Sequence, residues 1–176
     1  MSAGDQAEPT PHQAEPTPHG VTARPAVGHD TPDLARMHLA AVESLGAFPK
    51  GGPLANALSR GSVHADVAQG FAADLEGGER SVVVGLLGVT VVGYGVLRPS
   101  VPVQAPAVIE ELWVDPEARE VGVGSSLLDL LRDEADAAGS TAVDCVTLPG
   151  DRNTKNFFED HGMVARAITV SGPAQP

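Results

Sequence analysis

The chain has 176 residues, a formal net charge of −12 at pH 7 and one cysteine, Cys145. This length suits a single domain with a tail, and a lone cysteine excludes an internal disulfide framework and a cysteine-based metal cluster. The acidic balance disfavours nucleic acid as a partner, and because no apolar run reaches the roughly 18–20 residues of a membrane span and no signal-peptide core is present, we expect a cytoplasmic protein.

The chain begins with a polar, Pro-rich tail. Residues 6–12 read QAEPTPH, and residues 13–19 repeat the same seven letters. Such a segment holds no large apolar side chain and cannot offset the entropy lost on ordering. His12 and His19 leave open a weaker alternative, the binding of a stray metal ion or of a partner. We predict three parts: a disordered tail over residues 1–20, a folded domain over 21–171 and a short tail over 172–176.

Hydrophobic periodicity and turn residues predict the elements of the folded part. The amino-terminal half predicts, in order, a strand over 21–26, a helix that Asp30 or Thr31 caps and that reaches Leu45, a loop over 46–62, a helix over 63–75, and a hairpin of strands 81–87 and 90–98. The hairpin would turn at Gly88-Val89, although valine is a poor turn residue.

The carboxyl-terminal half alternates strands with helices. After a Pro-rich loop over 99–106, the pattern predicts a strand over 107–114, a helix over 122–138, a strand over 141–148, a short helix over 153–161 and a last strand over 164–170. A meander followed by strand–helix–strand units indicates an α/β protein with a mixed sheet.

A glycine-containing turn connects the strand over 107–114 to the helix that follows it. Arg119-x-x-Gly122-x-Gly124 opens that helix, so a phosphate can approach bare backbone N–H groups and the positive end of the helix dipole. A dinucleotide fingerprint would need a third glycine where Leu127 stands, although Asp144 lies near the position of its acidic residue. A P-loop would need Gly-Lys-Ser/Thr, which is absent from this turn.

The stretch Arg119-Glu120-Val121-Gly122-Val123-Gly124 resembles the Gln/Arg-x-x-Gly-x-Gly/Ala loop of the GNAT N-acetyltransferases. Leu112-Trp113-Val114-Asp115-Pro116 resembles the strand end before that loop, and Asn156 to Met163 resembles the family's Phe-Tyr-x-x-x-Gly-Phe element. The opening VTARPA and the helix after it also resemble the family's start. Over residues 21–171 the resemblance implies the GNAT acyl-CoA N-acyltransferase fold, a mixed, mostly antiparallel sheet with about four helices.

The resemblance also implies a reaction and a cofactor site. Members of the family transfer acetyl from acetyl-CoA to a primary amine by direct attack, and they occur as monomers or homodimers. The pantetheine arm would lie beside Leu112, Trp113 and Val114, with the Val114 N–H a candidate donor to the thioester carbonyl. The remaining implied contacts are the pyrophosphate loop, Arg119, Glu120, Val121, Gly122, Val123, Gly124 and Ser125, together with Asn156 and Phe158 of the last helix. The resemblance implies no metal.

Two neighbouring glutamates are candidates for the general base. Strict strand alternation places Glu110 on the same face as Leu112 and Val114, and Glu111 on the opposite face with Trp113. A bulge would change this assignment. The resemblance favours Glu110, because GNAT enzymes that act on polyamines and aminoglycosides carry a glutamate there, and Glu111 is the alternative.

The general acid departs from the family pattern. Phe158 stands where the family usually has a tyrosine, and it has no proton to donate. Tyr94, the only tyrosine in the chain, is a candidate donor, with a core position or a surface position as the alternatives. Ser125, Ser126 and His161 are weaker candidates.

The acceptor is expected to be a small cationic amine or a peptide or protein amine. A carboxylate in the cleft and the acidity of the chain favour a cation. The alternative function, suggested by Phe158 and by the duplicated tail, is an acyl-CoA-binding regulatory or interaction module with weak catalysis or none.

Overall fold

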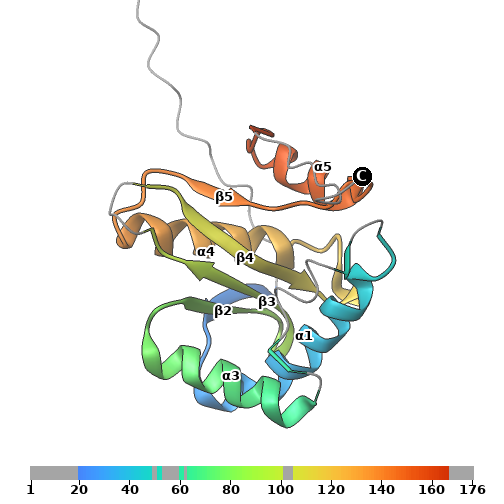
Figure 1. Ribbon diagram of the computed structural model, residues 1–176, viewed down its shortest axis with the longest axis vertical. Coiled ribbons are helices and arrows are strands. Elements are labelled where there is room, and N and C mark those ends of the chain that lie inside the picture. Colours follow the sequence, from blue (N-terminus) through green and yellow to red (C-terminus); the bar gives the residue numbers. More distant parts are fainter. Residues whose placement is uncertain (1–19, 49–50, 53–59, 62, 101–104, 167–176) are drawn as a thin grey trace, which may run out of the picture.

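The computed structural model describes residues 20–48, 51–52, 60–61, 63–100 and 105–166. Its described strands form one sheet in sequence order: β1 (Val21–Pro25), β2 (Ser81–Leu87), β3 (Thr90–Arg98), β4 (Ala107–Val114) and β5 (Val143–Cys145). The first four strands pair antiparallel, whereas β4 and β5 pair parallel (Figure 1). The predicted mixed, mostly antiparallel sheet is therefore confirmed.

Helices cover both faces of this sheet (Figure 1). One face packs against α1 (Thr31–Leu45) and α3 (His64–Gly77), and the other packs against α4 (Val123–Ala137). The last described helix, α5 (Arg152–Asp160), adds Phe158 to the apolar cluster beneath α4. Short 3₁₀ turns, η1 (Gly28–Asp30) and η2 (Pro116–Ala118), precede α1 and the glycine turn.

Asp30 joins β1 to the start of α1 in a way that differs from the predicted helix cap. Its side chain makes no capping hydrogen bond to α1. Its carboxylate instead accepts hydrogen bonds from the Arg24 guanidinium, at 2.7 and 2.9 Å, and from the Val27 backbone N–H. These bonds hold the pKa of Asp30 below its ordinary value even though burial acts to raise it.

Glycines on β2 and β3 let α4 approach the sheet closely. Gly85 and Gly93 are cross-strand partners. A Cβ atom at Gly85 would lie 2.7 Å from the Val123 side chain, and one at Gly93 would lie 3.1 Å from Leu127. These distances are too short for ordinary contacts, so only glycine leaves room for the apolar side chains of α4.

Three predictions about the elements need correction. The strand predicted over 141–148 forms only at Val143–Cys145, because β4 diverges from it and supplies three pairing partners. Within the loop predicted over 46–62, Gly51 and Gly52 are helical. Residues 164–166 are not in a strand, and the rest of the predicted last strand lies outside the described residues, as do residues 1–19.

Candidate functional site

The candidate site lies where β4 diverges from β5. Their described pairing runs from Ala107–Val143 to Ile109–Cys145 and ends there, while β4 continues beside β3 to Val114. Figure 1 shows the two strands diverging toward the start of α4. Leu112, Trp113 and Val114, beside which the family resemblance places the pantetheine arm, therefore lie beyond the described pairing with β5.

The glycine turn follows this split. Gly122 has a φ of +97° and caps α4, and Glu120 also has a positive φ of +64°. The hydrogen-bond ladder of α4 starts with the Ser126 N–H bound to the Gly122 carbonyl, so the N–H groups of Val123, Gly124 and Ser125 precede the ladder. Such a turn at a helix start presents backbone donors to an anion.

Helix α5 packs directly on this turn. A Cβ atom at Gly124 would lie 3.2 Å from the Phe157 ring, so Phe157 is the aromatic residue that covers the turn. Phe158 points into the core and is 5% exposed. Asn156 is exposed on α5. His161, which follows α5, contacts the Ser125 hydroxyl through Nε2 at 2.9 Å.

A bulge in β4 alters the predicted faces of the two glutamates. Val96 of β3 pairs with Glu111, but the next residue, Leu97, pairs with Ile109, so Glu110 is the extra residue. Leu112 packs on the α4 side, and the bulge moves Glu110 to the α1 and α3 side along with Glu111. Strict alternation therefore gave the wrong face for Glu110, because the register with β3 shifts at that residue.

Glu110 is held by two arginines. Its carboxylate accepts hydrogen bonds from Arg80 Nε at 2.7 Å and from Arg98 Nε at 2.8 Å, and its side chain is 20% exposed. Burial alone would raise the pKa of Glu110, but the two guanidinium groups outweigh that effect and lower it. Glu110 is therefore an ionised and partly accessible carboxylate.

Glu111 lies deeper and already accepts four hydrogen bonds. Oε2 accepts from the Tyr94 hydroxyl at 2.6 Å and contacts His38 Nδ1 at 2.8 Å, and Oε1 accepts from Nε and Nη2 of Arg60. Burial acts to raise the pKa of Glu111, and these partners together lower it. Its carboxylate has little remaining capacity for an acceptor amine.

Tyr94 is fully buried, at 0% exposure. Burial and the neighbouring Glu111 carboxylate raise the pKa of its hydroxyl well above the ordinary value. The structure therefore places Tyr94 in the core position that the sequence left as the alternative to a cleft position. The nearby ring nitrogens His38 Nε2 and Trp113 Nε1 are buried without a hydrogen-bond partner in the described structure.

Sequence reasoning missed the charge network that connects the two glutamates. Asp74 of α3 pairs with Arg60 and with Arg80, so a continuous series of opposite charges runs from Glu110 through Arg80, Asp74 and Arg60 to Glu111. The one local signal of this network is the spacing of His38, which lies four residues after Leu34 in the predicted helix and so shares its face. The other residues lie far apart in the chain and carry no motif.

Arg119, the first residue of the loop motif, contacts the end of β4. Its Nε donates to the Val114 carbonyl at 3.0 Å, and its guanidinium lies 4.8 Å from the centre of the Trp113 ring. Glu120 and Val121 are exposed, as is Arg119 itself. The motif arginine therefore fixes the strand end and the turn relative to each other.

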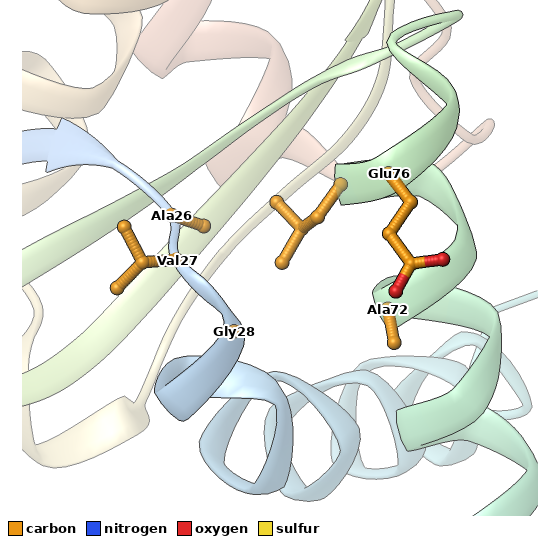
Figure 2. A pocket seen from close by; sticks show the side chains of 6 residues that line it. Ala26, Val27, Gly28, Ala72 and Glu76 are labelled. Atoms are coloured by element: carbon orange, nitrogen blue, oxygen red, sulfur yellow. The ribbon is translucent and has the colours of Figure 1, made fainter.

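A separate recess of about 390 Å³ lies near the opposite edge of the sheet (Figure 2). It is lined by Ala26, Val27 and Gly28 after β1, and by Ala72, Leu75 and Glu76 of α3. Since β1 and β5 are at opposite edges of the sheet, this recess is distinct from the split. Among the described residues, no group of three or more His, Cys, Asp or Glu is arranged to hold a metal, and no helix is long and apolar enough to cross a membrane.

Comparisons with known proteins identify the family. The model of the acetyltransferase (GNAT) family matches residues 56–163, which is more than half of the chain, so the chain belongs to this family. No curated protein matches it in sequence.

Solved structures show the same fold at low sequence identity. A transcriptional regulator from Bacillus halodurans is 20% identical, with a TM-score of 0.67 over 87% of this chain and 99% of that one. A protein from Clostridium acetobutylicum described as a predicted acetyltransferase, in a crystal structure with acetyl-CoA, is 12% identical, with a TM-score of 0.64 over 87% of this chain and 96% of that one. An N-acetyltransferase from Ralstonia eutropha is 18% identical, with a TM-score of 0.65 over 88% and 99%. The GNAT fold expected from the motifs is confirmed.

Proposed function

We propose that the protein is an N-acetyltransferase that moves the acetyl group of acetyl-CoA to a primary amine by direct attack. The observation that carries the proposal is the position of Glu110. Pairing between β4 and β5 ends at Ile109, and the next residue is this bulged, partly exposed carboxylate. Family membership supports acyl transfer in general.

The cofactor would bind along the split and the turn. The N–H groups at the start of α4 and the positive-φ turn before it suit a pyrophosphate. The pantetheine arm would follow Leu112, Trp113 and Val114, where β4 has separated from β5. The exposed Asn156 would contribute from α5, whereas the buried Phe158 would support the site through packing.

The chemistry requires removal of a proton from the acceptor ammonium. Glu110 would accept this proton, directly or through a water molecule, and the free amine would attack the thioester carbon. A C–N bond forms, the C–S bond breaks, and the CoA thiolate leaves and takes a proton from solvent. The Val114 N–H would stabilise the developing oxyanion. Much of the acceleration would come from aligning the two substrates.

The acceptor would be a small cationic amine or a peptide or protein amine. The net charge of −12 favours the approach of a cation over long range. The buried network at Glu111 neutralises its own charges internally, so Glu110 is the carboxylate best placed to meet an acceptor.

The test is an acetylation assay with the full chain. Purified protein, acetyl-CoA and a panel of polyamines, aminoglycosides and peptides are mixed, and free thiol is followed. We expect turnover with at least one amine and a loss of about 10²–10⁴-fold in kcat for Glu110→Gln, with unchanged CoA affinity. Glu117→Gln, at an exposed glutamate of η2, is the matched control and should keep its activity. Absence of thiol release with every amine would overturn the proposal.

A second candidate function is acyl-CoA binding without turnover. The observation that favours it is the full burial of Tyr94, the only tyrosine of the chain, which leaves no exposed phenol to protonate a leaving thiolate. This function predicts CoA binding in calorimetry and no acetylation of any amine. The assay above therefore separates the two candidates.

A further inference from the structure

The contact between His161 and Ser125 connects α5 to the proposed pyrophosphate turn. His161 Nε2 lies 2.9 Å from Ser125 Oγ, and His161 Nδ1 lies 2.7 Å from the backbone carbonyl of Phe157. Ser125 is the third residue of α4, in the same turn as the N–H groups that precede the helix ladder. The imidazole therefore contacts the one side-chain hydroxyl of that first turn that lies beside Gly124.

The Phe157 carbonyl fixes the tautomer of His161. A carbonyl oxygen only accepts hydrogen bonds, so Nδ1 carries a hydrogen whether the ring is neutral or charged. In the neutral ring, Nε2 then has no hydrogen, and the Ser125 hydroxyl must donate to it. In the charged ring, Nε2 carries a hydrogen and donates to Ser125 Oγ. The direction of this one bond therefore reports the charge of the ring.

The direction of the bond decides what Ser125 offers to an anion. When its hydroxyl hydrogen is used by His161, the serine oxygen presents only lone pairs, which repel a phosphate oxygen. When His161 donates instead, the hydroxyl hydrogen is free to point at the ligand beside the backbone N–H groups of the turn. Bound pyrophosphate and the charged ring therefore favour each other.

We propose that His161 is a positioning residue that turns the Ser125 hydroxyl into a phosphate donor when the ring is protonated, so that cofactor binding takes up a proton. This inference rests on the proposed function, because it assumes that the turn binds the cofactor's pyrophosphate. The affinity for the cofactor is therefore higher with the protonated ring than with the neutral ring, so it falls as the pH rises.

The other charged groups near His161 make no described contact with its ring nitrogens. On α4, Arg132 donates to the backbone carbonyl of His161 at 2.7 Å and lies 4.0 Å from Asp129. On α5, Lys155 pairs with Glu159, and Asp160 is exposed. The described contacts of the ring nitrogens are the Phe157 carbonyl and the Ser125 hydroxyl.

The test is calorimetry of the full chain with dephospho-CoA between about pH 5 and 8, the range in which an imidazole titrates. This probe keeps the pyrophosphate but lacks the 3′-phosphate, which would add a titration of its own. We expect the wild-type affinity to fall with pH by up to about tenfold per unit. At the upper end of this pH range, binding should take up a proton. The measured heat of binding should then vary with the ionisation enthalpy of the buffer.

Two variants separate this role from a structural one. The amide of His161→Gln can donate to Ser125 at every pH, so its affinity should be independent of pH and close to the wild-type value at low pH. Ser125→Ala should also lose the pH dependence, but at a weaker affinity. A wild-type affinity that does not change with pH, or variants that keep the wild-type slope, would overturn the inference.

A measurement on the wild-type protein covers the case in which a variant does not fold. In NMR spectra, dephospho-CoA should move the titration midpoint of the His161 ring to higher pH, and an unchanged midpoint would overturn the inference. Failure of dephospho-CoA and of CoA to bind at any pH would instead contradict the proposed function. The two failures are therefore distinguishable.

Discussion

The two faces of β4 are built in different ways. On the α4 face, Leu112 and Val114 join an apolar cluster, and the glycines of β2 and β3 let the helix come close. On the α1 and α3 face, Glu111 is surrounded by charged and polar partners. The comparison indicates that packing on the α4 face positions the glycine turn. On the α1 and α3 face, the polar partners keep the Glu111 carboxylate ionised.

The largest expected effect tests the charged face. Glu111→Gln should lower the free energy of unfolding by about 3–5 kcal/mol, because it leaves buried partners without their carboxylate. Glu110→Gln should cost less than about 1 kcal/mol, since a partly exposed ion pair contributes little. Urea unfolding of both variants measures the difference. Equal losses would show that the two glutamates are not distinguished by burial.

The next effect tests the apolar face. Gly93→Ala should lower the free energy of unfolding by about 1–3 kcal/mol, because the new Cβ would lie 2.9 Å from the Trp113 carbonyl and 3.1 Å from Leu127. Gly77→Ala is the control, since Gly77 is at the end of α3 and a Cβ added there would meet nothing within 4 Å. Thermal or urea unfolding should show no loss for this control. A tolerated Gly93→Ala would contradict the close approach of α4.

A smaller effect concerns the free energy of unfolding at low pH. The pKa values of Glu110 and Glu111 lie below the ordinary value in the folded state. Their stabilisation is therefore complete above the unfolded-state pKa of about 4.3 and is lost as the pH falls through the lower folded-state values. We expect unfolding free energy to decline more gently with acid in Glu111→Gln than in the wild type. Identical acid profiles would contradict this assignment.

The last effect, on reactivity and not on stability, concerns the Cys145 thiol at the edge of the split. Burial and the neighbouring Asp144 raise the pKa of Cys145 to about 11. Its reaction with a thiol reagent near neutral pH should be at least about a hundredfold slower than that of a free cysteine, because the thiolate is the reactive form. The protein unfolded in urea serves as the control. A fast reaction in the folded state would show that the Cys145 thiol is accessible to solvent in β5.

The sequence predicted the features that depend on local patterns. The bounds of β2, β3 and β4 match their predictions, because alternation and turn residues act over a few positions. The bulge at Glu110 depends on register with β3, so alternation within β4 alone could not locate it. The partners of Glu111 come from α1, from β3 and from Arg60, and such long-range pairing leaves no local signal.

The candidate site also combines features that a short stretch of sequence reveals with features that depend on tertiary packing. The glycine turn could be recognised because glycine spacing and helix starts are visible in a short stretch. The ring that covers the turn is Phe157 and not Phe158, and the packing angle of α5 decides this. The contact between His161 and Ser125 joins residues 36 positions apart, so only the folded chain brings them together.

The divergence of β4 from β5 creates an internal strand edge. An exposed edge of this kind usually invites pairing with another chain and is a hazard for aggregation. Here the edge lies between two diverging strands of the same sheet (Figure 1), so a strand from another chain would have to fit between β4 and β5. A ligand that completes the sheet at this edge would stabilise the fold by about 2.7 kcal/mol at a concentration 100 times its Kd.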